Sequence, residues 1–245
     1  MKRFLKKFPF LYSLVQRMYY TAFSIVELLG GTRIQEFRWK IRHLIRGKKW
    51  ARGYRDTLRH PHRAFLIEKI LAYQAIQTIM EVGCNAGPNL ILLHEKLPRA
   101  SLTGIDINRV AVGEGKQWLA ELRITNIRID VGYADDFAGF QDKSIDCIFT
   151  DATLMYIGPD KIQKVLSEFL RVATQHIVLL EYHADNPIQK TKLGFSYDGH
   201  WVYNYRNLFA NYQEVKKITV TKLPSELWQD SPGWNRYGNL IEISL

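Results

Sequence analysis

The fold is decided by Glu81-Val82-Gly83-Cys84-Asn85-Ala86-Gly87-Pro88-Asn89-Leu90 and by a second stretch, Gly104-Ile105-Asp106-Ile107-Asn108. The apolar run 76–82 predicts a buried strand, and the glycines after it predict a turn into a helix. Residues 101–107, which contain most of the second stretch, predict the next strand. A strand, turn, helix and strand in this order predict parallel pairing through a right-handed crossover.

The same alternation continues on the carboxyl side of these stretches. Further strands are predicted at 127–131, 144–150, 176–181, 214–221 and 239–244, and further helices at 109–122 and 159–172. With 245 residues, 47% of them hydrophobic, the chain is long enough to bury one full core. We therefore predict an α/β domain over residues 64–245, built on a doubly wound, mostly parallel seven-stranded sheet.

Residues 1–63 differ from this domain in charge. They hold 16 Lys and Arg against three acidic residues, whereas residues 64–245 hold 18 Lys and Arg against 21 Asp and Glu. One helical stripe follows the basic start of the chain and consists of Leu11, Val15, Met18, Ala22, Ile25 and Leu29. We predict a basic amphipathic helical extension over 1–63. Within it, residues 1–30 either pack on the domain or lie on an anionic membrane surface.

Targeting and redox features point to the cytoplasm. The apolar stretch after the first lysines is broken by Gln16, Arg17 and Glu27, so it predicts neither a signal peptide nor a membrane span. Cys84 and Cys147 fall in different predicted elements and indicate no disulfide framework or zinc site. We predict a cytoplasmic protein, peripheral at the inner membrane surface if residues 1–30 bind lipid.

The turn after residue 82 lies where a doubly wound sheet binds its ligand. A dinucleotide fold needs a glycine in the middle of this turn for a pyrophosphate, and Asn85 stands there instead. Carboxylates occupy the strand ends: Asp106 can accept hydrogen bonds from two ribose hydroxyls, and Glu81 can reach an ammonium. S-adenosylmethionine (SAM) offers a ribose and an ammonium without a phosphate, so it is the predicted cofactor.

Over about residues 76–181, the chain resembles class I SAM-dependent methyltransferases in these two stretches and in Gly132-Tyr133-Ala134-Asp135-Asp136-Phe137. The last patch is similar to the family's adenine loop, although the usual acid falls at Tyr133, so the Ala134 backbone and either Asp135 or Asp136 are expected to meet the adenine. The resemblance implies a Rossmann-like fold. The residues that we predict to bind SAM are Glu81, Gly83, Cys84, Asn85, Gly87, Asp106, Ile107, Ala134, Asp135 and Thr150.

Methyl transfer from a sulfonium is an in-line displacement that depends mainly on alignment and requires no metal. A hydroxyl acceptor also benefits from a base that removes its proton. Residues 150–159 follow the fourth predicted strand and face the methyl group. Tyr156 and Asp151 are therefore expected to reach the reacting centre.

Three segments, 150–159, 181–183 and 197–201, are similar to the methylases associated with pseudaminic acid and surface-polysaccharide biosynthesis. The chain departs from that group at Tyr156, where a histidine is usual, and at Asp198, where an arginine is usual. The resemblance implies a sugar or glycan acceptor. The implied catalytic residues are His183, His200, Tyr156 and Asp151, and the implied substrate-binding residues are Glu181, Tyr182, Tyr197 and Arg206. His183 can equally be a hydrogen-bonded histidine at a strand end.

The first functional hypothesis is methyl transfer from SAM to a hydroxyl of a sugar or glycan intermediate in surface-polysaccharide biosynthesis. The alternatives are methylation of a small molecule or lipid headgroup, and a binding protein that keeps the SAM fold without turnover. Nucleic acid is disfavoured as a partner because residues 150–153 lack the Asp-Pro-Pro-Tyr signature of adenine methylation.

Overall fold

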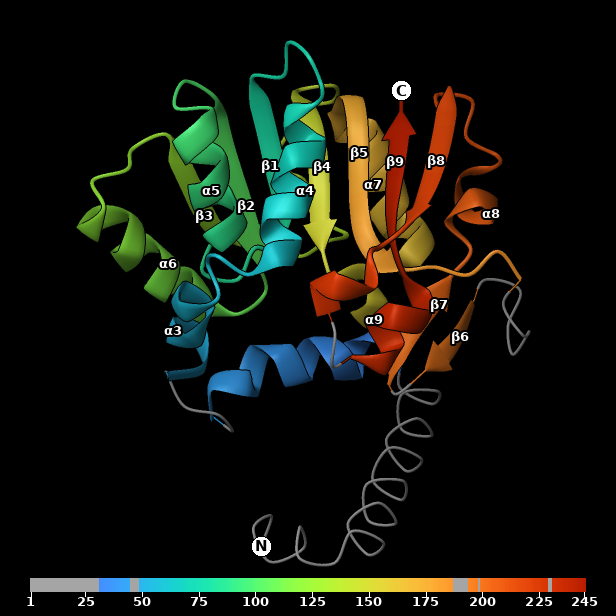
Figure 1. Cartoon of the computed structure of the whole chain (residues 1–245), viewed down its shortest axis with the longest axis horizontal. Helices are drawn as coiled ribbons and strands as arrows, with labels where there is room; N and C mark the ends of the chain where they lie inside the picture. Colours follow the sequence, from blue (N-terminus) through green and yellow to red (C-terminus); the bar gives the residue numbers. More distant parts are fainter. Residues whose placement is uncertain (1–30, 45–48, 187–193, 198, 229–230) are drawn as a thin grey trace, which may run out of the picture.

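The computed structural model describes residues 31–44, 49–186, 194–197, 199–228 and 231–245 (Figure 1). One sheet in this part of the chain has seven strands in the order β3-β2-β1-β4-β5-β9-β8. Its strands are β1 (Thr78–Val82), β2 (Ser101–Asp106), β3 (Ile127–Val131), β4 (Ile145–Asp151), β5 (Ala173–Tyr182), β8 (Lys217–Lys222) and β9 (Gly238–Ser244). The pairs from β3 to β5 are parallel, and β9 is antiparallel to both neighbours. The predicted doubly wound, mostly parallel seven-stranded sheet is confirmed.

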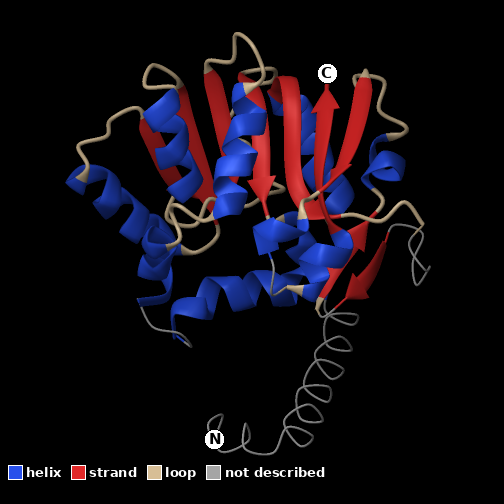
Figure 2. Cartoon of the chain, in the orientation of Figure 1, coloured by secondary structure: helices blue, strands red, loops and turns tan. Residues whose placement is uncertain are grey.

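Helices cover both faces of the sheet (Figure 2). The labelled helices of the structure are α3 (Lys49–Asp56), α4 (Pro61–Leu71), α5 (Pro88–Lys96), α6 (Arg109–Glu121), α7 (Ile162–Val172), α8 (Tyr205–Phe209) and α9 (Pro232–Tyr237), of which α3 and α9 lie at the carboxyl end of the sheet (Figure 1). Apolar residues of α4, α5 and α6 pack on one face, and those of α7 and α8 pack on the other. Successive strand residues serve opposite faces, as Ile79 and Met80 do in β1, because side chains alternate along a strand. Burial on both sides explains the nearly continuous apolar strands in the sequence.

The stretch after residue 181 contains elements that the sequence pattern did not predict. Strands β6 (Gly194–Tyr197) and β7 (His200–Tyr203) form a separate antiparallel hairpin, and a short 3₁₀ turn, η2 (Ser225–Trp228), follows later in this stretch. A second short 3₁₀ turn, η1 (Leu154–Tyr156), lies earlier in the chain, after β4. These elements and α9 are six residues long or shorter. Such lengths are too short for a hydrophobic period to be recognised.

A helical segment, residues 31–44, crosses the carboxyl edge of the sheet beside α3 (Figure 1). Its start is tied to the loop before α7: the Thr32 amide donates to both Asp160 carboxylate oxygens at 3.1 Å, and the Thr32 hydroxyl donates to Asp160 at 2.8 Å. Lys161 forms an ion pair with Glu36 one turn further on. We call residues 31–44 the roof helix.

The predicted 63/64 domain boundary falls inside α4. Residues 31–44 and 49–63 contact the sheet domain, and the predicted stripe at 11–29 lies outside the described residues. Within the part of the chain that the structure describes, none of the helices has the length and apolar character needed to cross a membrane.

Candidate active site

A cavity of about 290 Å³ lies between the carboxyl ends of β1, β2 and β4 and the roof helix. Its position is that expected for a ligand site in a doubly wound sheet. The walls come from segments far apart in sequence: Thr32, Gln35, Glu36, Trp39, Tyr54, His62, Arg63, Glu81, Val82, Gly83, Cys84, Asn85, Pro88, Asn89, Ile105, Asp106, Ile107, Gly132, Tyr133, Ala134, Asp151, Ala152, Thr153, Tyr156, Ile157, Trp228 and Trp234.

The turn after β1 passes very close to the turn after β4. Gly83 has a φ of +81°, and a Cβ atom built on it would lie 2.1 Å from the Thr153 hydroxyl. Any other residue would therefore be strained and would collide with the neighbouring turn. Asn85 is also left-handed, with a φ of 52°, and its side-chain oxygen accepts a hydrogen bond from the Ala86 amide.

The Asp106 carboxylate connects the turn after β1 with the turn after β2. One carboxylate oxygen accepts from the Asn85 amide and the other from the Asn108 amide, both at 2.8 Å. Burial raises the pKa of Asp106 to about 6, against the opposing effect of these two amides. Asp106 thus has a structural role in addition to lining the cavity.

Glu81 is only 2% exposed, and one of its two oxygens accepts from the Asn89 side chain at 2.7 Å. The other oxygen is buried and has no hydrogen-bond partner among the described residues. Burial raises the pKa of Glu81 to about 8. A buried carboxylate oxygen that lacks a donor at a cavity wall fits a cationic ligand group such as an ammonium.

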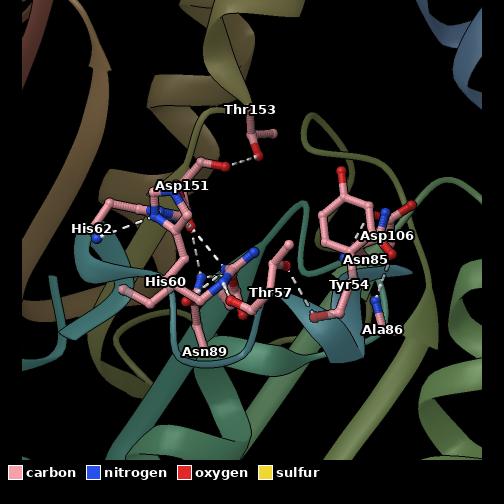
Figure 3. Close-up of polar contacts among 12 residues, drawn as sticks. Tyr54, Thr57, His60, His62, Asn85, Ala86, Asn89, Asp106, Asp151 and Thr153 are labelled. Carbon is pink, nitrogen blue, oxygen red and sulfur yellow. Dashed lines mark hydrogen bonds and ion pairs between the residues drawn. The ribbon is translucent and has the colours of Figure 1, made fainter. Parts of the chain in front are cut away.

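Asp151, at the end of β4, is the centre of a polar network (Figure 3). A single carboxylate oxygen lies 3.1 Å from the His62 ring nitrogen Nε2, 3.1 Å from the Arg63 guanidinium and 3.0 Å from the Asn89 amide nitrogen. Burial alone would raise the pKa of Asp151, but His62 and the Arg63 guanidinium hold it well below its usual range. Through Asn89, the network extends to Glu81.

Most residues predicted to bind SAM line this cavity, and three do not. Glu81, Gly83, Cys84, Asn85, Asp106, Ile107 and Ala134 are among the wall residues. Gly87 instead caps the start of α5 in a left-handed conformation. The Thr150 hydroxyl is fully buried and donates to Glu181 at 2.8 Å.

Asp135 is the third exception. Its carboxylate forms ion pairs with Lys161 and Lys164, each at 3.0 Å, on the side of α7. Burial opposes but does not cancel the two lysines, which lower the pKa of Asp135. These contacts occupy the carboxylate that the sequence assigned to the adenine edge, while Ala134 remains at the cavity wall.

Of the residues predicted to serve the acceptor, Asp151 and Tyr156 line the cavity, whereas Glu181 and His183 do not. Glu181 is fully buried and accepts from the Thr150 hydroxyl and from the amides of residues 153, 154 and 155. His183 is bonded to Asp185 through one ring nitrogen and to the Tyr205 amide through the other. Both side chains hold turns together, and neither lines the cavity, so the structure does not place Glu181 where it was predicted to contact substrate.

The remaining predicted residues lie around the hairpin and β5. His200 packs edge-on against Tyr156 and Tyr182, and neither His200 nor Tyr182 is a wall residue. The Arg206 side chain is 46% exposed and pairs with Asp185 at 3.3 Å, away from the cavity. Tyr197 ends β6, and its side chain lies outside the part of the chain that the structure describes.

Sequence reasoning missed His62, Arg63, Trp228 and Trp234 as site residues. Pro61 did mark the start of α4, but no spacing connects residue 62 to residue 151. The two tryptophans stack with centroids 4.2 Å apart, and His62 stacks on Trp228 at 4.4 Å. Only the fold brings the first turn of α4 against η2 and the end of β4.

Residues 79–176 match a family model described as a methyltransferase domain. The malonyl-[acyl-carrier protein] O-methyltransferase of Anoxybacillus flavithermus is 33% identical over 85 residues, which are 35% of this chain and 31% of that protein. This chain thus spans about a third of the length of that curated relative.

Two solved structures share the fold. A SAM-dependent methyltransferase from Aquifex aeolicus matches with a TM-score of 0.55 and 17% identity, over 77% of this chain and 95% of that chain. Geranyl diphosphate C-methyltransferase from Streptomyces coelicolor, solved with S-adenosyl-L-homocysteine, matches with a TM-score of 0.59 and 15% identity, over 74% and 75% of the two chains. The fold is that of class I methyltransferases, and the comparisons support SAM as the cofactor.

Proposed function

We propose that this protein transfers a methyl group from SAM to a neutral hydroxyl, in the first place on a sugar or glycan intermediate of surface-polysaccharide biosynthesis. The observation that carries the acceptor class is the charge of the cavity wall. Asp106 and Asp151 line it as carboxylates at neutral pH, and the one arginine among the described wall residues is paired with Asp151.

The part of the cavity around Glu81 and Asp106 offers hydrogen-bonding groups that match those of SAM. The buried oxygen of Glu81 that lacks a partner suits the ammonium of the methionine part, and Asp106 at the end of β2 suits the ribose hydroxyls. When bound, SAM supplies a methyl group on a positively charged sulfur. The chain contributes carboxylates that favour this positive charge and walls that exclude water.

The balance of charge around Asp151 and Arg63 disfavours an anionic acceptor. Three of the five N–H donors of the Arg63 guanidinium are used by the Thr57 carbonyl, the Asn89 side chain and Asp151, and the Asp151 carboxylate balances its positive charge. The aromatic walls suit the apolar face of a sugar ring and consist of Trp39, Tyr54, Tyr156, Trp228 and Trp234.

The same aromatic walls accommodate a small molecule or a lipid headgroup, which is the second candidate. A non-catalytic SAM-binding protein is the third. We place the reaction in the cytoplasm, where the two buried cysteines, Cys84 and Cys147, stay reduced. Tritiated methyl transfer from SAM into fractionated cell extract distinguishes the three, because the labelled fraction identifies the acceptor class and the absence of label indicates binding alone.

Asp106→Ala tests the cofactor site directly. Loss of a charged acceptor for two hydroxyls should weaken SAM binding by about 2–4 kcal/mol, or roughly thirtyfold to a thousandfold. Isothermal titration with SAM measures this, with Asp142→Ala as a control because Asp142 is exposed and pairs only at the surface with Arg171. A folded Asp106→Ala protein that binds SAM like the parent would contradict the assignment.

A further inference from the structure

The roof helix contacts two loops of the domain through one of its faces. Thr32, Glu36 and Lys40 are spaced four residues apart, so they share this face. Thr32 is bonded to the loop before α7, and Glu36 forms an ion pair with Lys161 in the same loop. The Lys40 amine lies 4.6 Å from the centre of the Tyr133 ring, in the loop after β3. The roof helix is therefore attached to both loops at successive turns.

The Lys161 amine connects the two loops and the roof helix. It pairs with Glu36 on the roof helix and, at 3.0 Å, with Asp135 in the loop after β3. The side chains of Lys161, Glu36 and Asp135 are 22%, 20% and 10% exposed, so salt and water screen these pairs less than pairs at the open surface. Burial lowers the pKa of Lys161, but the two carboxylates outweigh burial and raise it, so the amine is charged at neutral pH.

The loop after β3 and the roof helix form two walls of the same cavity. The Gly132 amide donates to the Asp106 carbonyl at 3.1 Å, and residues 132–134 line the cavity together with Asp106. Glu36 lines the cavity from the roof helix. Lys161 is not a wall residue, so it connects these two walls from outside the cavity.

We propose that Lys161 is a positioning residue that couples SAM binding to the placement of the roof helix. SAM bound beside Asp106 restrains residues 132–134, and the pairs of Lys161 with Asp135 and Glu36 transmit this restraint to the roof helix. Such coupling is reciprocal, so the placed roof helix in turn strengthens the binding of SAM. This inference rests on the cofactor part of the proposed function and is independent of the acceptor.

Hydrogen exchange of the full-length protein, with and without saturating SAM, measures the coupling. In the parent protein, SAM should slow exchange over residues 31–44 about tenfold. In Lys161→Met it should slow exchange there only about twofold, because the contact of Lys40 with Tyr133 remains. The slowing over residues 132–136 should persist in this variant. Lys161→Arg keeps the charge and should restore most of the parent effect.

Lys164→Met is the matched control. Lys164 pairs with the other carboxylate oxygen of Asp135 at 3.0 Å and, within the described residues, forms no ion pair with the roof helix. This variant should therefore keep the parent slowing over residues 31–44. An equal loss of slowing in Lys164→Met and Lys161→Met would overturn the proposal, as would parental slowing in Lys161→Met. A parent protein that binds SAM without slower exchange over 31–44 overturns the coupling alone, and one that does not bind SAM overturns the cofactor site with it.

A double-mutant cycle tests whether Lys161 acts through Glu36. Lys161→Met should raise the dissociation constant of SAM about fivefold in the parent background. In the Glu36→Gln background the pair is already broken, so the same change should have at most about a twofold further effect. Titration calorimetry with SAM measures the four dissociation constants. A fivefold effect in both backgrounds would show that Lys161 acts independently of the roof helix and would overturn the proposal.

Discussion

Two buried glutamates near the carboxyl ends of β1 and β5, the two strands that flank β4, have different environments. Glu181 on β5 receives four hydrogen bonds, one from Thr150 in β4 and three from the turn after β4, whereas Glu81 on β1 receives one. Burial raises the pKa of Glu181 to about 7 and that of Glu81 to about 8. The carboxylate with an unused buried oxygen is the one that we assign to ligand binding.

This environment makes the stability of the ligand-free protein depend on pH through Glu81. Below about pH 4.5 the side chain holds its proton in both folded and unfolded states. Between about 4.5 and about 8 the unfolded chain releases the proton while the folded protein keeps it, so stability falls as the pH rises. Glu81→Gln should remove this loss, by at most about 5 kcal/mol at pH 8.5.

Thermal melts of the two proteins at pH 5 and pH 8.5 measure the effect. The melting temperature of Glu81→Gln, relative to the parent, should be higher at pH 8.5 than at pH 5. Glu95→Gln is the control because Glu95 forms a surface pair with Arg59. An equal difference at the two pH values would show that Glu81 ionises normally in the folded state.

At the scale of elements, the roof helix lines the cavity, and a cluster of polar contacts holds its first turn. Thr32 joins it to Asp160, and the Thr32 hydroxyl also accepts from the Gly158 amide at 2.7 Å. Gly31 has a φ of +55°, and a Cβ atom there would lie 2.7 Å from the Asp160 carboxylate. The start of the roof helix thus depends on one carboxylate and one glycine.

Asp160→Ala should loosen the roof helix without unfolding the sheet. The loss of hydrogen bonds to a partly exposed carboxylate should cost about 1–2 kcal/mol. We expect faster hydrogen exchange over residues 31–44 and faster SAM dissociation in stopped-flow experiments. Asp142→Ala serves as the control. Unchanged exchange over 31–44 would mean that the other contacts, such as the Asn108 bond to the Trp39 carbonyl, hold the helix by themselves.

At the scale of the whole molecule, charge separates the first 63 residues from the rest. The basic start of the chain, with the stripe from Leu11 to Leu29, predicts that residues 1–30 bind anionic lipid. Anionic headgroups contribute about 1 kcal/mol for each nearby cation, so binding should weaken strongly with salt. Sedimentation with anionic and neutral vesicles compares the full chain with a variant lacking residues 1–30.

The full chain should sediment with anionic vesicles at low salt, and the shortened chain should not. Equal sedimentation of the two proteins would exclude residues 1–30 as a membrane anchor. A lower melting temperature of the shortened chain would then indicate that this stripe packs on the domain.

The sequence by itself determined the central sheet and placed Glu81, Gly83 and Asp106 at the edge of the sheet where the cavity lies. The signals for them are local: the hydrophobic periods of strands and helices, the Gly83 turn, and the carboxylates Glu81 and Asp106. Parallel crossovers then bring the carboxyl ends of such strands to one edge of the sheet. The sequence did not predict the short elements, such as the β6–β7 hairpin, because no hydrophobic period in them is long enough to detect.

Only the tertiary structure decided which acidic and histidine side chains line the cavity. Glu181 and His183 follow a strand just as Asp151 does, yet their polar atoms are bonded to residues 153–155, 185 and 205. His62 precedes the first strand and reaches the cavity through contacts with β4 and η2. Whether a side chain is free for a ligand depends on the donors that other elements bring to it, and sequence spacing does not contain that information.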